Sequence, residues 1–180
     1  DPIMAVRAFA VVHARYRSAS LTMAGPVKVP ELLEKTRRAI ADAGLEDAVS
    51  IVGPVSKQDV PLLLARHDLF INTTSLESFG VAVMEAAASG MPIVSTEAGE
   101  IPYLWRDGAD SLLGPVGDAQ AMGDAIVRLL DDSLLRCRIA AAARAKAETF
   151  DWSKVIPQWL EILQSTQMEQ RCSGRFVKKK

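Results

Sequence analysis

The sequence predicts an α/β fold in which helices cover both faces of a parallel sheet. Short apolar segments alternate along the chain with longer stretches of helical periodicity, a succession typical of parallel strands joined by helices. Gly-Pro turns end two of the apolar segments, at Gly25 and at Gly53. With 180 residues, of which 49% are hydrophobic and 24% charged, the chain is expected to be globular and to bury one sizeable core. We therefore expect a Rossmann-like domain whose ligands bind at the carboxyl ends of the strands.

The first half of the chain contains three of the expected strands and three helices. In chain order the predicted elements are a helix over 3–16, a strand over 21–24, a helix over 30–43, a strand over 49–52, a helix from 56 to 65 and a strand over 69–72. Pro30 suits the first turn of its helix, and Gly44 ends it. Ser56 and Asp59 resemble a capping arrangement for the third helix.

The second half continues the alternation and then becomes helical. The predicted elements are a helix over 79–89, strands over 93–95 and 112–113, and helices over 119–130, 133–148 and 152–163. Asp118 is the expected N-cap of the first of the three late helices. We expect residues 1–164 to form a single domain and residues 165–180 to form a basic, flexible tail.

Four loops follow predicted strands, and we expect them to share one edge of the sheet. They are residues 25–29, 53–57, 73–79 and 96–102. Because the carboxyl ends of parallel strands meet at one edge, this is where a ligand site is predicted.

Charge and cysteine content exclude several classes of function. The net charge is −1, and five of the 21 basic residues lie in the last ten positions, so the rest of the chain is clearly acidic; this argues against general nucleic-acid binding. Cys137 and Cys172 form no close-spaced pair, which indicates neither a disulfide framework nor a metal site and favours a reducing cytoplasm. The tail lysines could reach an anionic membrane as a peripheral contact, although a solvated tail is the simpler interpretation.

The segment over residues 75–96 contains the residues that folding alone does not explain. Between Phe79 and Ser95 the single charged side chain is Glu85, set in a helix that is apolar nearly all round. Such a helix is normally buried. Burying even a neutral polar group without a partner costs roughly 2–7 kcal/mol, so Glu85 is expected to need a partner that the local sequence does not supply.

A nucleotide diphosphate would satisfy both the helix start and Glu85. Unpaired N–H groups and the helix dipole favour a phosphate at a helix N-terminus, and Gly80 would allow its close approach. Glu85 lies about 7–8 Å further along the axis, at ~1.5 Å per residue. Its two oxygens can accept hydrogen bonds from the vicinal hydroxyls of a ribose. Glu77, before the helix, would then face the transferable group.

These residues resemble a known family signature. Glu77 and Glu85 are separated by seven residues, Ser78-Phe79-Gly80 follows the first, and residues 89–94 read SGMPIV. The arrangement is similar to the E-x7-E motif of retaining nucleotide-sugar glycosyltransferases with the two-domain GT-B fold, the family 4-like group. The resemblance implies that the chain is the C-terminal, donor-binding half of such an enzyme, acting on a sugar or lipid-linked acceptor.

The same resemblance implies roles for single residues. Glu77 is the implied catalytic residue that contacts the donor sugar. The implied donor-binding residues are Ser78, Phe79, Gly80 and Val81 for the diphosphate, Glu85 for the ribose, Gly99 for close backbone approach and Val52 for the nucleotide base. Gly99 has an ordinary turn as its alternative, because Glu100 replaces the family's second loop glycine, and Val52 has the core as its alternative. The donor is expected to carry UDP, GDP or ADP.

No metal or further cofactor is expected. The sequence contains no Asp-x-Asp pair, and its two histidines, His13 and His67, lie far apart and have no metal-like neighbours, so both are expected to be structural or solvated. The departing diphosphate would need cations and helix dipoles instead.

Part of the family pattern is not matched. The family carries an Arg and a Lys after the first strand of this domain, and an N-terminal domain that contacts the acceptor; the sequence begins beyond both, so the first strand is expected to be missing. Arg7, Arg15 or Lys28 would have to substitute for the cations. The alternative hypothesis is a degenerate domain that acts as a protein-interaction module through any exposed tryptophan among Trp105, Trp152 and Trp159.

Overall fold

Five short parallel strands form the sheet layer of the computed structural model, which describes residues 1–173, with side chains through residue 165. The strands are β1 Leu21–Ala24, β2 Val49–Gly53, β3 Phe70–Asn72, β4 Ile93–Thr96 and β5 Leu112–Gly114. Every pairing between them is parallel. Each strand lies within one residue of its predicted range, so the predicted strands are confirmed.

The sheet layer is divided into two parts. Strands β1 and β2 pair with each other, and β3, β4 and β5 form a second sheet in that order. A cavity of about 840 Å³ lies between β1 and β3 and is lined by both strands along their length. The break therefore lies between β1 and β3, where one more parallel strand would fit.

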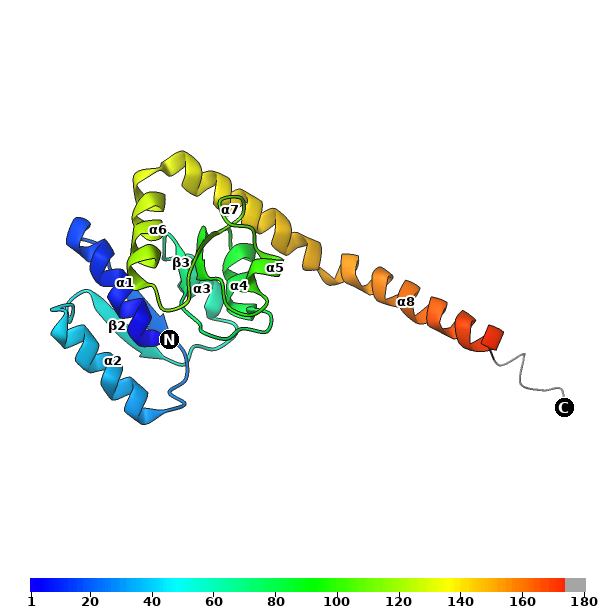
Figure 1. Cartoon of the computed structure of the whole chain (residues 1–180), viewed down its shortest axis with the longest axis horizontal. Helices are drawn as coiled ribbons and strands as arrows, with labels where there is room; N and C mark the ends of the chain where they lie inside the picture. The colour runs from blue at the N-terminus through cyan, green and yellow to red at the C-terminus, as the bar shows by residue number, and fades with distance from the viewer. Residues whose placement is uncertain (174–180) are drawn as a thin grey trace.

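Helices cover both faces of this layer, as predicted (Figure 1). One face is covered by α1 Pro2–Arg15, α2 Pro30–Asp42 and α6 Ala119–Asp131, and the other by α4 Val81–Ala88, α5 Ile101–Leu104 and most of α7 Ser133–Ala147. A hydrophobic core lies on each face of the sheet, and successive residues of β4 point into different cores: Ile93 packs on the side of α4 and Val94 on the side of α1. This is the alternation expected of a strand buried on both faces.

Aspartate side chains cap several of the described helices. Asp1, Asp118 and Asp132 each accept a backbone N–H three residues further on, at 3.0, 2.9 and 2.9 Å. The predicted cap at Asp118 is confirmed. The Ser56–Asp59 contact also forms, with the Asp59 N–H 3.3 Å from Ser56 Oγ, but regular α-helix begins later, as α3 Val60–Leu64. The short helix α5 was not predicted.

The last helix, α8 Trp152–Ser173, extends away from the body of the domain (Figure 1). It follows a short 3₁₀ turn, η1 Glu148–Phe150. Large apolar side chains of α8 are exposed; among them Trp152 is 72% exposed and Trp159 58%, whereas Trp105 in the body is 1% exposed. The predicted tail covers residues 165–180. Its residues 165–173 belong to the backbone of α8, and residues 174–180 lie outside the described residues.

We predict that the N-terminal cap of α8 is sensitive to acid. Asp151 Oδ1 accepts the Ser153 N–H at 2.9 Å, and hydrogen bonding from the Ser153 side chain is the main cause that lowers the pKa of Asp151 below its ordinary value of 3.8. Because the folded-state pKa is the lower one, this contact stabilises the folded chain above the ordinary pKa, and the contribution is lost as the pH falls through the lowered value.

The check is an NMR titration of the Asp151 carboxyl group. Ser153→Ala is expected to raise the pKa of Asp151 toward its ordinary value. Ser165→Ala, which removes a hydroxyl bonded to the Ile162 carbonyl on the same helix, is expected to leave it unchanged. An ordinary pKa for Asp151 in the unmodified chain would contradict this prediction.

Candidate functional site

Glu77 lies half-buried in the loop between β3 and α4. Its Oε1 accepts the backbone N–H of Ser78 at 3.0 Å and that of Phe79 at 3.4 Å. These two amides are among the groups that the sequence analysis assigned to the diphosphate. The carboxylate therefore already provides an anionic acceptor for amides at the start of α4.

Gly80 forms the N-cap of α4 in a left-handed conformation, with φ 78° and ψ 55°. The helix therefore begins at Val81, two residues later than predicted. The backbone angle favours glycine here, and a Cβ atom on Gly80 would also lie 3.0 Å from Ile101 Cδ1 of α5, a tight contact. Ser78, Phe79 and Val81 around it are exposed.

Helix α4 is buried on one face and open on the other. Val83, Ala86 and Ala87 are buried against α7 and the sheet, whereas Val81 and Glu85 are exposed. The expectation of a helix buried all round was wrong, because no described element covers the second face. The Glu85 carboxylate has no hydrogen-bond or ion-pair partner among the described residues, and Glu85 lines the large cavity between β1 and β3.

Loops that follow strands line this cavity, as predicted for the carboxyl edge of the sheet. Three of the four predicted loops contribute to it, through the pairs Gly25-Pro26, Pro54-Val55 and Thr73-Thr74. The fourth loop, over residues 96–102, does not line the cavity. It lies against the loop that carries Glu77.

Hydrogen bonds join the ends of β3 and β4 and the loops that follow them. Thr96 Oγ1 donates to the Thr74 carbonyl at 2.6 Å, and Asn72 Nδ2 donates to Ser95 Oγ at 3.0 Å. None of these four residues was predicted from the sequence as part of the site. The available signal was small polar residues at the ends of two successive strands.

Gly99 approaches the backbone of Glu77 more closely than any side chain would permit. A Cβ atom at position 99 would lie 1.9 Å from the Glu77 carbonyl oxygen, and the Glu100 N–H donates to that oxygen at 3.1 Å. The structure thus brings Gly99 together with Glu77, and Gly99 does not line the large cavity.

Val52 is not brought to the Glu77 cluster. It is 49% exposed on β2, in the other sheet, and lines neither cavity. Residues next to Val52 in the sequence do line cavities: Pro54 and Val55 line the large cavity, and Ile51 lines a second, smaller one. A base that packs near this segment would contact residues 54 and 55 before Val52.

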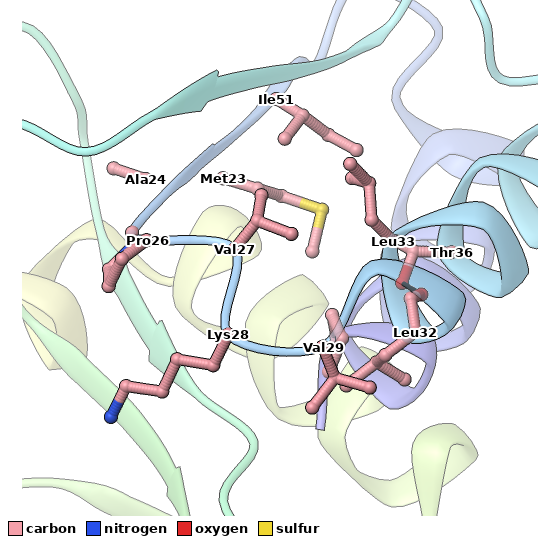
Figure 2. Close-up of a pocket in the computed structure, with 12 residues that line it drawn as sticks. Met23, Ala24, Pro26, Val27, Lys28, Val29, Leu32, Leu33, Thr36 and Ile51 are labelled. Carbon is pink, nitrogen blue, oxygen red and sulfur yellow. Dashed lines mark hydrogen bonds between the residues drawn. The ribbon is translucent and has the colours of Figure 1, made fainter.

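The smaller cavity, of about 300 Å³, lies between β1 and α2 (Figure 2). Met23, Leu33 and Ile51 point into it, whereas the Lys28 side chain extends away from it (Figure 2). An apolar lining without an inward cation does not suit a diphosphate.

Two of the three candidate cations remain available. Arg15 pairs with Asp131 at 2.8 Å, at the C-terminal end of α1. The start of α1 lies at the carboxyl edge of the sheet, where Thr73 Oγ1 donates to the Asp1 carbonyl. Arg15 is therefore at the far end of the helix and does not substitute for the family's cations. Arg7 and Lys28 are exposed and have no ion-pair partner among the described residues.

His67 lines the large cavity with both ring nitrogens engaged. Nδ1 lies 2.8 Å from the Leu63 carbonyl oxygen and Nε2 lies 2.8 Å from Thr22 Oγ1. This is the structural role that was expected. Within the described residues, no group of three or more His, Cys, Asp or Glu side chains could hold a metal ion. No helix in that part of the chain is long and apolar enough to cross a membrane.

The fold matches solved glycosyltransferase structures. The Anabaena protein Alr3699/HepE, in a crystal structure with UDP, superimposes with a TM-score of 0.82 at 26% identity, over 90% of this chain and 44% of that one. The C-terminal domain of a glycosyl transferase group 1 family protein from Francisella tularensis has the same fold, with a TM-score of 0.73 at 22% identity, over 82% and 77% of the two chains. Fold and motif together define the C-terminal half of a GT-B glycosyltransferase.

The sequence comparisons identify the family. The model described as "Glycosyl transferases group 1" matches residues 3–132. The amylovoran biosynthesis glycosyltransferase AmsK of Erwinia amylovora is 36% identical over 141 residues, 74% of this chain and 35% of that protein. A phosphatidyl-myo-inositol mannosyltransferase of Mycobacterium leprae is 37% identical over 123 residues, 68% and 33% of the two chains. The chain belongs to the group 1 glycosyl transferases, and it spans about a third of the length of these relatives.

Proposed function

We propose that this chain is the donor-binding domain of a retaining hexosyltransferase that uses a nucleoside diphosphate sugar. One arrangement carries the proposal: Glu77 lies on the amides of Ser78 and Phe79 at the start of α4, while Glu85 stands unpaired among the described residues on the open face of the same helix. Crystal structures of the Anabaena relative with UDP and with UDP-glucose support it, at 26% identity.

The donor diphosphate binds at the N-terminus of α4. The amides of Ser78, Phe79 and Gly80 and the positive end of the helix dipole favour an anion there. Since the Glu77 carboxylate already accepts two of these N–H groups, it must turn away as the diphosphate arrives. The displaced carboxylate is then free to accept hydrogen bonds from the donor sugar.

Glu85 binds the ribose, and loop residues beside the cavity contact the base. Glu85 shares the large cavity with Pro54 and Val55, so a nucleoside whose ribose meets Glu85 has its base within reach of that loop. Val81, at the exposed first turn of α4, is the last of the four residues proposed to bind the diphosphate. Val52 would contact the base only if the loop after β2 moves.

The transfer step follows the family resemblance. The acceptor hydroxyl attacks the anomeric carbon on the face from which the diphosphate leaves, so the configuration is retained, and the proton passes from the acceptor to the departing phosphate oxygen. Charge on the diphosphate is offset by the α4 dipole and by cations. Arg7 and Lys28 are the candidates that this chain offers. No metal enters the proposal, since the sequence has no Asp-x-Asp pair.

Residues 1–164 form the donor domain in this proposal, with residues 165–180 as a basic tail. One further parallel strand between β1 and β3 completes the sheet, and a second domain supplies the acceptor contacts. The exposed apolar side of α8 is a suitable surface for that domain. The cytoplasmic location stays a prediction.

A protein-interaction module remains the second candidate, and the exposure of Trp152 and Trp159 favours it. Under this hypothesis the Glu77 and Glu85 carboxylates have no nucleotide to bind. The two candidate functions therefore predict different titration results: a donor domain binds a nucleotide sugar, and an interaction module does not.

Calorimetric titration tests the proposal directly. Of UDP-glucose, GDP-mannose and ADP-glucose, we expect one to bind the 180-residue chain with a micromolar to millimolar Kd, and the corresponding nucleoside without phosphates to bind at least tenfold more weakly because the α4 amides lose their anion. No heat with any of the three sugars at millimolar concentration would refute the proposal.

A further inference from the structure

The loop between β4 and α5 contacts the segment around Glu77 at three successive points. Thr96 Oγ1 donates to the Thr74 carbonyl at 2.6 Å. The Glu100 N–H donates to the Glu77 carbonyl at 3.1 Å. Ile101 Cδ1 would lie 3.0 Å from a Cβ atom on Gly80. Two hydrogen bonds, from Thr96 at the end of β4 and from Glu100 before α5, therefore hold the segment over 74–80, and Ile101 at the start of α5 leaves little room beside Gly80.

Gly99 makes the middle contact possible. A Cβ atom at this position would lie 1.9 Å from the Glu77 carbonyl oxygen, 2.9 Å from the carbonyl carbon and 3.1 Å from the Glu77 nitrogen. The first of these distances is far inside van der Waals contact with backbone atoms, which cannot swing aside as a flexible side chain can. Gly99 also has φ +55°, a conformation that residues with a side chain rarely adopt.

The space in front of Gly99 is thus filled by Glu77 and is not left open for a ligand. This differs from the role that the family resemblance implies for Gly99, a close approach to the donor. The Glu77 carbonyl and the Ser78 N–H belong to one peptide group, so a shift of that group would change the geometry between the carboxylate and the two amides to which it bonds.

We infer that Gly99 is a positioning residue, which fixes the backbone of Glu77 and thereby sets the carboxylate on the Ser78 and Phe79 amides. The consequence for donor binding rests on the proposed function, whereas the positioning itself does not. Any residue larger than glycine at position 99 separates the two loops and releases Glu77.

Amide hydrogen exchange measured by NMR tests the positioning without any ligand. In the unmodified chain the Ser78 and Phe79 N–H groups should be protected by the Glu77 carboxylate, with Glu77→Ala defining the unprotected rate. Gly99→Ala is expected to accelerate exchange at both amides at least tenfold, toward that rate. Unchanged exchange at both amides would overturn the inference.

Gly108→Ala is the matched control. Gly108 has φ +70°, so alanine there suffers comparable backbone strain, but a Cβ atom would have no other atom within 4 Å. This variant should leave exchange at Ser78 and Phe79 within twofold of the unmodified chain. An equal acceleration by both variants would show a general loss of stability and refute a specific role for Gly99.

A second variant serves if Gly99→Ala fails to fold. Glu100→Pro removes the N–H that donates to the Glu77 carbonyl, and φ −81° at Glu100 suits proline. It should accelerate the same two amides, while Glu100→Gln, which keeps the N–H, should not. A Glu100→Pro chain with unaltered exchange would contradict the inference.

Titration with UDP-glucose then separates the inference from the proposed function. Gly99→Ala should weaken binding of UDP-glucose at least tenfold, because its Cβ displaces the peptide group that joins Glu77 to Ser78 and with it the amides proposed to bind the diphosphate, whereas Gly108→Ala should leave the Kd within twofold. Equal losses in the two variants would count against positioning. If the unmodified chain binds no nucleotide sugar, the proposed function fails, and the exchange rates still decide the role of Gly99.

Discussion

A Glu85→Gln variant is expected to bind UDP-glucose ten- to a hundredfold more weakly than the unmodified chain. A hydrogen bond to a charged group contributes about 1.5–3 kcal/mol, and each 1.4 kcal/mol corresponds to a factor of about ten in Kd. Glutamine keeps the volume of the side chain but offers one acceptor oxygen in place of two, so it cannot accept from both hydroxyls of a vicinal diol.

Folding should not respond to this change. The Glu85 side chain is exposed and has no partner among the described residues, so its replacement should alter the free energy of unfolding by no more than about 0.5 kcal/mol. Glu46→Gln, at another exposed glutamate without a partner in the described chain, is the matched control and should leave the Kd unchanged.

The ligand provides a second control. The unmodified chain should bind 2′,3′-dideoxy-UDP more weakly than UDP. Glu85→Gln should abolish most of that difference in affinity, because the ribose hydroxyls donate their hydrogen bonds to the Glu85 carboxylate. Equal affinity of both chains for UDP-glucose would exclude Glu85 as the ribose ligand. It would also favour an interaction module, which should keep its partner in either chain.

Replacing Lys146 by Met is expected to lower the free energy of unfolding by about 3 kcal/mol. Lys146 pairs with Asp110, a residue that is only 6% exposed, and its Nζ also donates to the Leu104 carbonyl at 2.6 Å. Removing one partner of a buried ion pair leaves an uncompensated charge and costs about 3–5 kcal/mol. The lower value applies because the Lys146 side chain is 23% exposed.

The loss should appear in thermal and urea unfolding. For a chain of this size 1 kcal/mol corresponds to about 2–4 °C in Tm, so we expect a fall of roughly 6–12 °C. Arg144→Met is the control on the same helix: Arg144 pairs with Glu148 at 3.2 Å, but both side chains are more than half exposed, and such pairs contribute about 0–1 kcal/mol. Equal effects of the two variants would contradict the prediction.

Local signals in the sequence were sufficient for most of the elements. Pro30 and Gly44 delimit α2 within two residues, and Asp118 caps α6 as expected, because helix ends depend on neighbouring residues. Helices on both faces followed from the alternation of strands and helices. The late start of α3 after Ser56, and the unpredicted α5, show how poorly local patterns define short helices.

The predicted site residues depended on contacts that local patterns do not specify. The sequence suggested that Glu85 would be buried, but whether a helix face is covered depends on distant elements, and no described element covers this face of α4. The Thr96–Thr74 bond and the Gly99–Glu77 contact join residues 22 positions apart in each case, so periodicity could not indicate them. The family motif identified Glu77 and Glu85 but not what holds them in place.

The facing edges of β1 and β3 have a consequence for work with the 180-residue polypeptide in solution. An open strand edge exposes backbone donors and acceptors that another chain can pair with, and proteins normally protect such edges. The edges of β1 and β3 border the same large cavity, and within the described residues each of these strands pairs with another strand on one side only. Concentrated samples should therefore self-associate by intermolecular strand pairing. The apparent molar mass measured by light scattering should rise with protein concentration under conditions in which the domain is still folded.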